Sequence, residues 1–427
     1  MVALLAASHL ATAQKISDYA LHIDKIGQEA ANLHVVCSFG VDFQGADSIS
    51  MYFGGGQEYS IDNLKMHGDG CEYTYDYAQK KIVIRRKDDR TVRVGMDYDY
   101  TNLSAFFIYG EGDAELWETS FGEYFYPYVP NTYMDVAIEV ETPDSLSFLC
   151  SYPLAANSAT RYSGTLKHIL SQSLTLAFLR TDAYQRTEAE LPGEVSVYQI
   201  KGMQCGRERY DELLELTGAS IAFFSKVYGE DYVSAERNVT ALPAYLFHNG
   251  KGFSNRYNIG FISASQEKFS TSPDIYPLVH EIGHRWLGEW TLLIDDGEPG
   301  AYFIKESLNE FMTLLFIRHY YGAETYEKQL DWCRSEYGKI KDTPQDEPIV
   351  DVVVNNNNTV VYRKGPLVLD RMAKKIGYDE LVGIIAGFYR EYAGKYPLKY
   401  TDFIDMVNAS HAGAGDTLRH LLAAKSL

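Results

Sequence analysis

The stretch YPLVHEIGHRWLGEW, residues 276–290, contains the pattern His280-Glu281-x-x-His284. Residues four apart share one face of a helix, with Cβ atoms about 5–6 Å apart, so two imidazoles can bind one metal ion. Glu281 stands beside them, where its carboxylate can accept a proton from water without being a ligand. The pattern also arises by chance, but its apolar neighbours are typical of a helix on a cleft floor: Leu278, Val279, Ile282, Trp286 and Leu287.

A catalytic zinc site needs a third protein ligand, and residues 301–322 supply two candidates. Apolar residues recur there at helical spacing, and Glu306 and Glu310 share one face of the predicted helix. Glutamates usually mark a solvated face, yet an unpaired carboxylate within such an apolar run is costly. We assign Glu306 as the third ligand and Glu310 as the carboxylate that orients a ligand histidine. The reverse assignment, with Glu310 as the ligand, stays open.

With these residues the sequence resembles the gluzincin metallopeptidases and, among them, the M1 aminopeptidase family. Two departures stand out: the 21 residues between His284 and Glu306 require a short loop insertion, and Ser307 replaces the family's glycine. A second segment, VVYRKGPLVLDRMAKKIG at 360–377, resembles the family's Tyr-x-Lys-Gly segment. The resemblance implies that Tyr362 donates a hydrogen bond to the oxyanion that develops during catalysis.

The resemblance is weaker before the zinc motif. Residues 121–154 are similar to part of the family's N-terminal β domain. The M1 exopeptidases carry a Gly-x-Met-Glu-Asn strand whose glutamate binds the substrate's ammonium group, but the corresponding residues 241–262 contain no glutamate. Gly250 and Gly252 remain as candidate substrate-binding positions, because glycine backbone suits a strand edge that pairs with an extended peptide. Specificity for a free amino terminus is therefore left open.

The composition is that of a globular chain with more than one core. The 427 residues are 46% hydrophobic and 23% charged, and the net charge of −19 argues against nucleic acid and anionic membranes as partners. No apolar run reaches the roughly 18 residues of a membrane-spanning helix, so we expect no stable membrane insertion. The five cysteines neither demand nor exclude a disulfide, and their spacing does not predict a metal site.

The period of the hydrophobic pattern changes once along the chain, from that of strands to that of helices. Residues 1–14 resemble an export signal, which predicts a periplasmic or secreted protein. Residues 15–200 show short alternating runs between Gly, Asp and Asn turns, which predict an antiparallel β domain. From 201 to 427 the period is mostly helical, and the resemblance implies a thermolysin-like catalytic domain. The expected fold class is therefore α+β, and a chain without the family's C-terminal helical domain should have an open cleft.

The predicted function is hydrolysis of peptide bonds in a peptide or protein substrate, with one Zn²⁺ per chain, by an aminopeptidase-like enzyme. Glu281 and Tyr362 are the predicted catalytic residues, and His280, His284 and Glu306 the predicted ligands. Two alternatives stay open. One is a metallohydrolase of the same fold that opens epoxides, and the other is a peptide-binding module without catalysis.

Overall fold

The computed structural model describes most of the chain: residues 15–25, 31–54, 59–87, 91–102, 108–109, 116–118, 125–188, 195–202, 205–234, 239, 241–248, 255–272, 275–288, 290–295, 297–353 and 357–427. The expected leader (1–14), Gly250 and Gly252 lie outside these residues, so what was predicted for them stays a prediction. Among the described residues, no helix is both long enough and apolar enough to cross a membrane.

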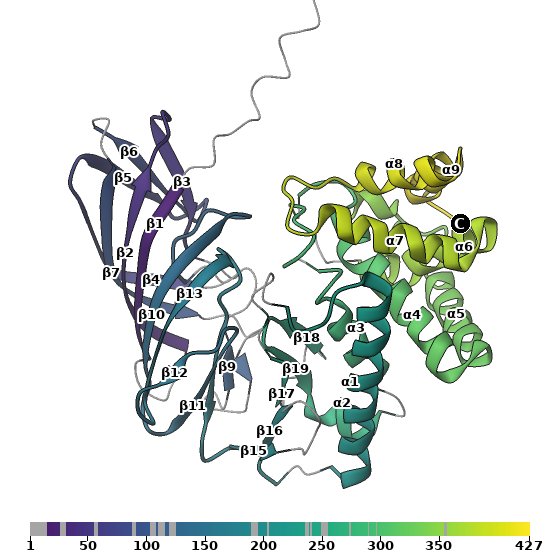
Figure 1. The fold of residues 1–427 in the computed structure, drawn as a ribbon, viewed down its shortest axis with the longest axis horizontal. Helices are drawn as coiled ribbons and strands as arrows, with labels where there is room; N and C mark the ends of the chain where they lie inside the picture. The colour runs from purple at the N-terminus through teal and green to yellow at the C-terminus, as the bar shows by residue number, and fades with distance from the viewer. Residues whose placement is uncertain are drawn as a thin grey trace, which may run out of the picture. The chain divides into compact units, whose positions relative to one another are not determined.

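The chain divides into two compact units, each drawn in Figure 1. The first comprises residues 1–204, 235–254 and 258–268, and its secondary structure is mainly strands. The second comprises residues 205–234, 255–257 and 269–427, and its secondary structure is mainly helices. The predicted α+β fold is thus confirmed.

The largest sheet of the first unit has the strand order β12-β13-β10-β1-β2-β7-β4. Its neighbours are antiparallel except for β1 and β10, which run parallel, so the prediction of a purely antiparallel domain is wrong for that pair. Alternation explains the sheet: in the sequence YMDVAIEVE of β10, every second side chain is buried. The bounds are β1 (Lys15–Lys25), β2 (Ala31–Asp42), β4 (Tyr59–Gly68), β7 (Val92–Asn102), β10 (Tyr133–Glu141), β12 (Ala155–Ala156) and β13 (Arg161–Leu170).

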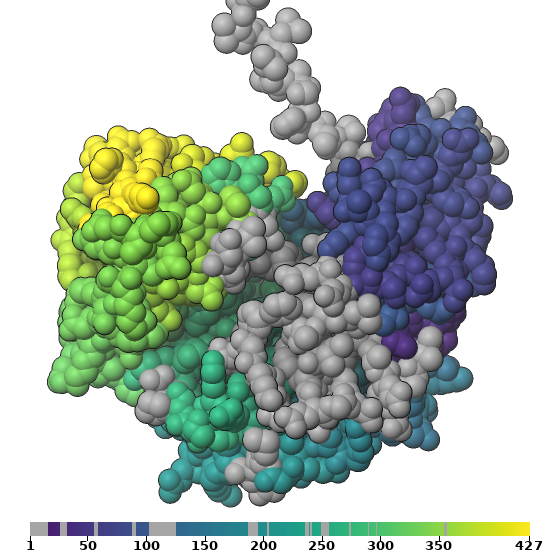
Figure 2. Space-filling view, turned by 180° about the vertical axis from the view of Figure 1, so that it is seen from behind, coloured from purple at the N-terminus to yellow at the C-terminus, as the bar shows by residue number. Residues whose placement is uncertain are grey.

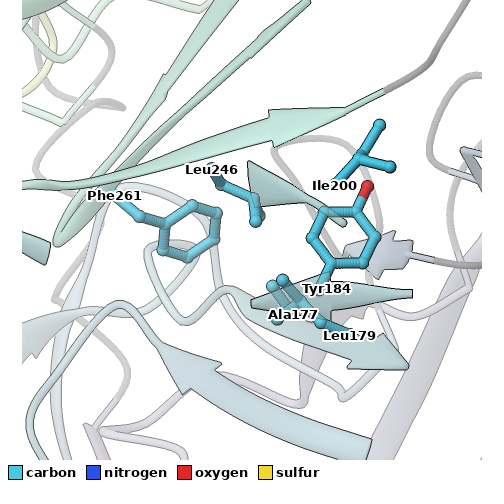
Figure 3. Packing of buried hydrophobic residues seen from close by; sticks show 6 residues of the cluster. All are labelled: Ala177, Leu179, Tyr184, Ile200, Leu246 and Phe261. Carbon is cyan, nitrogen blue, oxygen red and sulfur yellow. The ribbon is translucent and has the colours of Figure 1, made fainter. Parts of the chain in front are cut away.

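Among the residues that the structure describes, three smaller sheets have the orders β3-β6-β5, β11-β14-β9-β8 and β15-β16-β17-β19-β18. A buried apolar cluster joins strands of the last two (Figure 3): Ala177, Leu179, Tyr184, Ile200, Leu246 and Phe261. The bounds are β3 (Ser48–Tyr52), β5 (Cys71–Asp76), β6 (Lys81–Arg86), β8 (Ile108–Tyr109), β9 (Leu116–Glu118), β11 (Leu146–Cys150), β14 (Leu176–Arg180), β15 (Tyr184–Glu188), β16 (Ser196–Ile200), β17 (Ala244–His248), β18 (Asn255–Asn258) and β19 (Phe261–Ser265).

Buried tyrosines fix the segment that follows residue 124. Tyr19 and Tyr98 donate hydrogen bonds to the carbonyl oxygens of Pro127 and Phe125, at 2.8 and 2.7 Å. Tyr126 in turn donates to Ser171 O at 2.6 Å. Each ring is buried in the core while its hydroxyl finds a backbone acceptor, which removes the cost of burying that polar group.

The second unit contains the helices that carry the predicted site. The helix of the zinc motif, α3 (Tyr276–Gly283), packs against α1 and α4. The remaining bounds are α1 (Arg207–Tyr228), α4 (Leu308–Tyr321), α5 (Ala323–Gly338), α6 (Gly365–Ile376), α7 (Tyr378–Tyr392), α8 (Tyr400–Ser410) and α9 (Ala414–Ala423), together with the 3₁₀ turn η3 (Ile349–Asp351) and the π-helical turns η2 (Phe303–Ser307) and η4 (Val360–Lys364). A short helix, α2 (Gln266–Thr271), precedes α3.

The residues after α3 are held by a buried polar contact. Arg285, only 3% exposed, donates from Nε to Tyr232 O at 2.8 Å and from Nη2 to Glu230 Oε1 at 2.9 Å. Trp286 is fully buried and stacks on Tyr228, with ring centroids 5.8 Å apart. The chain immediately beyond the second histidine is therefore buried and held by hydrogen bonds and a ring contact.

Candidate metal centre

The zinc motif begins in α3 and ends just beyond it. The helix ends at Gly283, yet His284 keeps a helical backbone with φ −61° and ψ −15°. Its side chain therefore stays on the face occupied by His280, as a helical spacing of four requires. The two imidazole rings lie with their centroids 4.6 Å apart and nearly perpendicular planes.

The third candidate ligand comes from a π-helical turn. In η2 the Leu308 N–H bonds to Phe303 O, five residues back, and such turns are often found at functional sites. The turn buries Glu306 and directs its Oε2 to the two histidines. That oxygen lies 3.3 Å from His280 Nε2 and 3.3 Å from His284 Nε2.

These separations fit a tetrahedral zinc ion. Donor atoms 2.0–2.2 Å from such an ion lie about 3.3–3.5 Å from one another. The two 3.3 Å distances match that spacing and are longer than a typical charge-assisted hydrogen bond of about 2.7–2.9 Å. One donor atom from each of the three residues lies within 4.8 Å of the others, and two imidazoles with one carboxylate are a common donor set for catalytic zinc.

Both histidines are oriented through their other ring nitrogen. His280 Nδ1 lies 2.8 Å from Glu310 Oε2, and His284 Nδ1 lies 3.0 Å from Leu287 O. Leu287 O requires a proton on His284 Nδ1, and a neutral His280 with its proton on Nδ1 has that proton beside Glu310. Both Nε2 lone pairs are then left for a metal ion. Glu306 and Glu310 thus contact opposite sides of the His280 ring. This geometry favours Glu306 over Glu310 as the ligand.

The charges of the centre favour a cation. Burial by itself would lower the pKa of His280, but the carboxylates of Glu306 and Glu310 outweigh it and raise this pKa to about 10. The pKa of His284 is also raised, because its contacts with Glu306 outweigh burial. Burial opposes the charge of Glu306, yet the two histidines hold its pKa well below the usual range. A divalent ion would supply this positive charge in place of the protons.

Glu281 has the surroundings of a general base. Its burial raises the pKa of its carboxyl group, while the nearby His284, His280 and Arg256 oppose that shift. Arg256 belongs to β18, and no motif in the sequence around it indicates this role. A carboxylate with a raised pKa is a better proton acceptor near neutral pH than a solvated one.

Tyr362 reaches the same centre from η4. Its ring centroid lies 5.6 Å from that of His280, and the residue is partly buried. The turns η2 and η4 are joined by a hydrogen bond of 2.7 Å from Ser307 Oγ to Val361 O. A Cβ added at Gly365 would lie 2.2 Å from Ser307 Oγ, so glycine is needed for this close approach. The serine that departs from the family pattern therefore links the two turns.

Two further residues, not predicted as functional, support the centre. Asn309 donates from Nδ2 to His280 O at 2.8 Å, and a Cβ added at Gly283 would lie 2.2 Å from Asn309 Oδ1. Arg363 donates to Glu310 Oε1 at 3.0 Å and stacks on Trp332, with its guanidinium carbon 3.9 Å from the ring centroid. Both lie next to predicted site residues, but their roles depend on contacts between distant segments.

No family model and no curated protein matches the sequence. Among solved structures, a mutant of the M1 zinc metallopeptidase from Deinococcus radiodurans superposes with a TM-score of 0.69 at 16% identity, covering 97% of this chain and 95% of that one. Native yeast LTA4 hydrolase superposes with a TM-score of 0.73 at 12% identity, covering 96% of this chain and 68% of that one. This chain has the M1 zinc-metallopeptidase fold.

The M1-like fold is the one that the sequence resemblance predicted. Two further structures, of a two-domain M1 zinc metallopeptidase mutant bound to L-arginine and to L-tryptophan, each superpose with a TM-score of 0.68, at 16% and 15% identity. The alignments cover 97% of this chain and 95% of those chains. At identities of 12–16% the likeness establishes the fold, and the chemistry has to be argued from the site itself.

Proposed function

We propose that this chain is a zinc-dependent peptidase that hydrolyses peptide bonds. The observation that carries the proposal is the convergence of His280 Nε2, His284 Nε2 and Glu306 Oε2, with the carboxylate oxygen 3.3 Å from each nitrogen. These three residues would hold one zinc ion, and the M1-like fold supports that assignment. The remaining groups of the centre match the needs of amide hydrolysis.

When bound, zinc supplies Lewis-acid polarisation and lowers the pKa of water to about 7. The Glu281 carboxylate accepts a proton from the attacking water and passes it to the nitrogen of the leaving amine. The Tyr362 hydroxyl donates a hydrogen bond to the carbonyl oxygen as negative charge develops there. Glu310 and Leu287 O hold the two imidazoles in the tautomer that this arrangement needs.

We propose a peptide as the substrate, cleaved in an aminopeptidase-like manner. The Deinococcus mutant is described in complex with a Tyr-Ser-Ala substrate, and 97% of this chain aligns with it at a TM-score of 0.68. The net charge of −19 disfavours nucleic acid as a substrate. The absence of glutamate from residues 241–262 leaves the contribution of a free amino terminus to be measured.

Substitution of Glu281 by Gln tests the proposed chemistry. Gln keeps the shape but cannot accept a proton, so kcat should fall by at least about 10²–10⁴-fold while zinc content stays stoichiometric. Tyr362→Phe should lower kcat by about 10²–10³-fold, again with zinc retained. Glu327→Gln, on a side chain about half exposed in α5, and Tyr396→Phe, on an exposed tyrosine, are matched controls that should leave kcat unchanged.

The two variants also separate the peptidase from a binding module. If Glu281→Gln retains zinc and hydrolyses peptides with nearly the wild-type kcat, the peptidase mechanism is wrong. If the wild-type protein binds zinc and peptides but hydrolyses neither amides nor other substrates, the binding module takes its place.

A second candidate is a metallohydrolase of the same fold with a non-peptide substrate. It is favoured by the likeness to yeast LTA4 hydrolase, which has a TM-score of 0.73. Parallel assays on peptide amides and on an epoxide distinguish the two. Turnover of the epoxide alone, abolished by Glu281→Gln, would replace the peptidase proposal.

A further inference from the structure

Lys364, two residues after Tyr362, has a fully buried ammonium group. Its side chain and that of Asp346 are both 0% exposed, and Nζ lies 2.9 Å from Asp346 Oδ1. Nζ also donates to the carbonyl oxygens of Glu347, Ala424 and Lys425, at 2.8, 3.0 and 2.7 Å. An ammonium group has three N–H donors, so these four oxygens use all of its hydrogen-bonding capacity.

Two of the four oxygens belong to residues 424–427, here called the tail segment. Ser426 Oγ lies 2.6 Å from Asp342 Oδ1 and 2.9 Å from Asp346 Oδ2, so its one proton is shared between these two carboxylates. The Leu427 N–H donates to Tyr337 OH at 3.1 Å. Tyr337 OH in turn donates to Asp346, at 3.0 Å from Oδ2. In Figure 2 the yellow C-terminal residues lie on the surface of the second unit, against the green residues of its earlier helices. The tail segment thus completes the set of polar groups that surround the Lys364 ammonium group.

The opposite side of η4 faces the candidate metal centre. Pro366 has no N–H. It therefore cannot donate the α-helical hydrogen bond to Tyr362 O, four residues back, or the π-helical one to Val361 O, five residues back. Arg363 Nη1 donates a hydrogen bond to Tyr362 O at 2.8 Å, and the Ser307 hydroxyl donates one to Val361 O. Two carbonyl oxygens of the turn thus accept hydrogen bonds from side chains, and the Lys364 side chain holds the turn on the far side.

We infer that Lys364, held by Asp346 and the tail segment, is a positioning residue that sets the place of Tyr362 in the catalytic centre. The inference rests on the proposed peptidase function for its kinetic consequences. Lys364 itself touches neither a candidate ligand nor Tyr362 in any contact described above. It acts through the backbone of the five-residue turn that the two side chains share.

The coupling follows from the cost of burying charge. An ammonium group in the interior is tolerated only when its hydrogen-bond partners are in place. If the tail segment leaves, Lys364 loses two of its four acceptors and the turn must move to let water or other groups replace them. A displacement of about 1 Å at a catalytic group can lower the rate about 100-fold.

The first experiment compares three variants. Lys364→Met/Asp346→Asn removes the buried charge pair without leaving either charge unpaired, and Ser426→Ala removes one contact of the tail segment. Lys375→Met is the matched control, because Lys375 Nζ donates to Thr417 Oγ1 and so links α6 to α9 away from η4. We expect the double variant to lower kcat by about 10–100-fold with KM and zinc content unchanged, Ser426→Ala to act in the same direction, and Lys375→Met to have no effect.

A double-mutant cycle separates positioning from general loss of structure. In the Tyr362→Phe background, where the hydroxyl is already gone, the same changes at Lys364, Asp346 or Ser426 should lower kcat no further. An equal loss of kcat in both backgrounds would overturn the inference. If the double variant does not fold, Ser426→Ala in the two backgrounds decides the question by the same comparison.

A measurement independent of activity keeps this inference separate from the proposed function. 3-Fluorotyrosine placed at position 362 gives one ¹⁹F signal in the zinc-free protein. The signal should shift or broaden in Ser426→Ala and in Lys364→Met/Asp346→Asn, and stay in place in Lys375→Met. If the wild-type protein hydrolyses no peptide, the proposed function fails while this signal still tests the positioning. An unchanged signal in all three variants would refute it.

Discussion

Replacing the two glutamates of the metal centre one at a time should have sharply different effects on zinc binding. Glu306→Ala removes one of three donor groups and leaves only the two imidazoles. Glu310→Ala removes the carboxylate that lies 2.8 Å from His280 Nδ1 and leaves all three donors. Loss of such an orienting contact typically weakens metal binding about 10–100-fold. At about 1.36 kcal/mol per tenfold change, that is about 1.4–2.7 kcal/mol, and Glu306→Ala should exceed it clearly.

The effect of Glu310→Ala should depend on pH. In the zinc-free protein Glu310 helps to raise the pKa of His280 to about 10, so a proton competes with zinc at pH 7. Removing Glu310 weakens that competition and partly offsets the lost contact. The measured loss of affinity should therefore be smaller at pH 7 than at pH 9, where less of the wild-type His280 is protonated.

Competition with a chelator at pH 7 and pH 9 measures both dissociation constants, and metal content after dialysis gives the stoichiometry. Glu324→Ala is the control, because this glutamate is 84% exposed and pairs only with Lys328 in its described ion pairs. Stoichiometric zinc in Glu306→Ala together with loss of zinc in Glu310→Ala would reverse the ligand assignment and refute the reasoning from the two ring nitrogens.

Three further predictions concern proton release, packing and specificity. Zinc binding at pH 7 should release protons, and the affinity for zinc should fall on acidification, because His280 with a pKa of about 10 must lose its proton to bind the metal. Calorimetry in two buffers of different ionisation enthalpy measures the number of protons released, and a value of zero would contradict the prediction. Gly283→Ala should destabilise the fold by about 1–3 kcal/mol, because the new Cβ meets Asn309 at 2.2 Å, whereas Gly338→Ala, where a Cβ meets nothing within 4 Å, should not; thermal unfolding compares them. Acetylation of a peptide's amino terminus should slow its cleavage less than in an M1 exopeptidase that carries the glutamate, because residues 241–262 contain none. Rates for the free and N-acetylated forms of one peptide measure this, and strict dependence on the free amine would contradict it.

The helix that carries His280 and His284 could be predicted from the sequence because its signal is local. Spacing of four places His280 and His284 on one face whatever surrounds them, and the apolar neighbours mark the helix as buried. The alternating runs of the β domain are equally local. The parallel pairing of β1 with β10 is not, because it joins strands more than a hundred residues apart, and no period in either strand reveals its partner.

The sequence favoured Glu306 over Glu310 as the ligand but left the reverse assignment open. A spacing of four puts both carboxylates on one face, and either could approach the histidines. The structure places Glu306 on the π-helical turn η2, opposite both Nε2 atoms, and Glu310 against Nδ1 of His280. Such a turn has no sequence period of its own, since it depends on contacts with another segment, here the bond from Ser307 to Val361 O.

The sequence by itself determined which chemical groups are present and which local elements carry them: the two imidazoles, the carboxylates of Glu281, Glu306 and Glu310, and the phenol of Tyr362. These follow from residue type and helical period, which involve only neighbours in the chain. Tertiary structure alone decided which ring nitrogen faces which carboxylate, and that Lys364 is buried against carbonyl oxygens 60 residues away. The physical reason is that burial and hydrogen bonding are satisfied between distant segments, so only the folded chain determines the partner of each polar group.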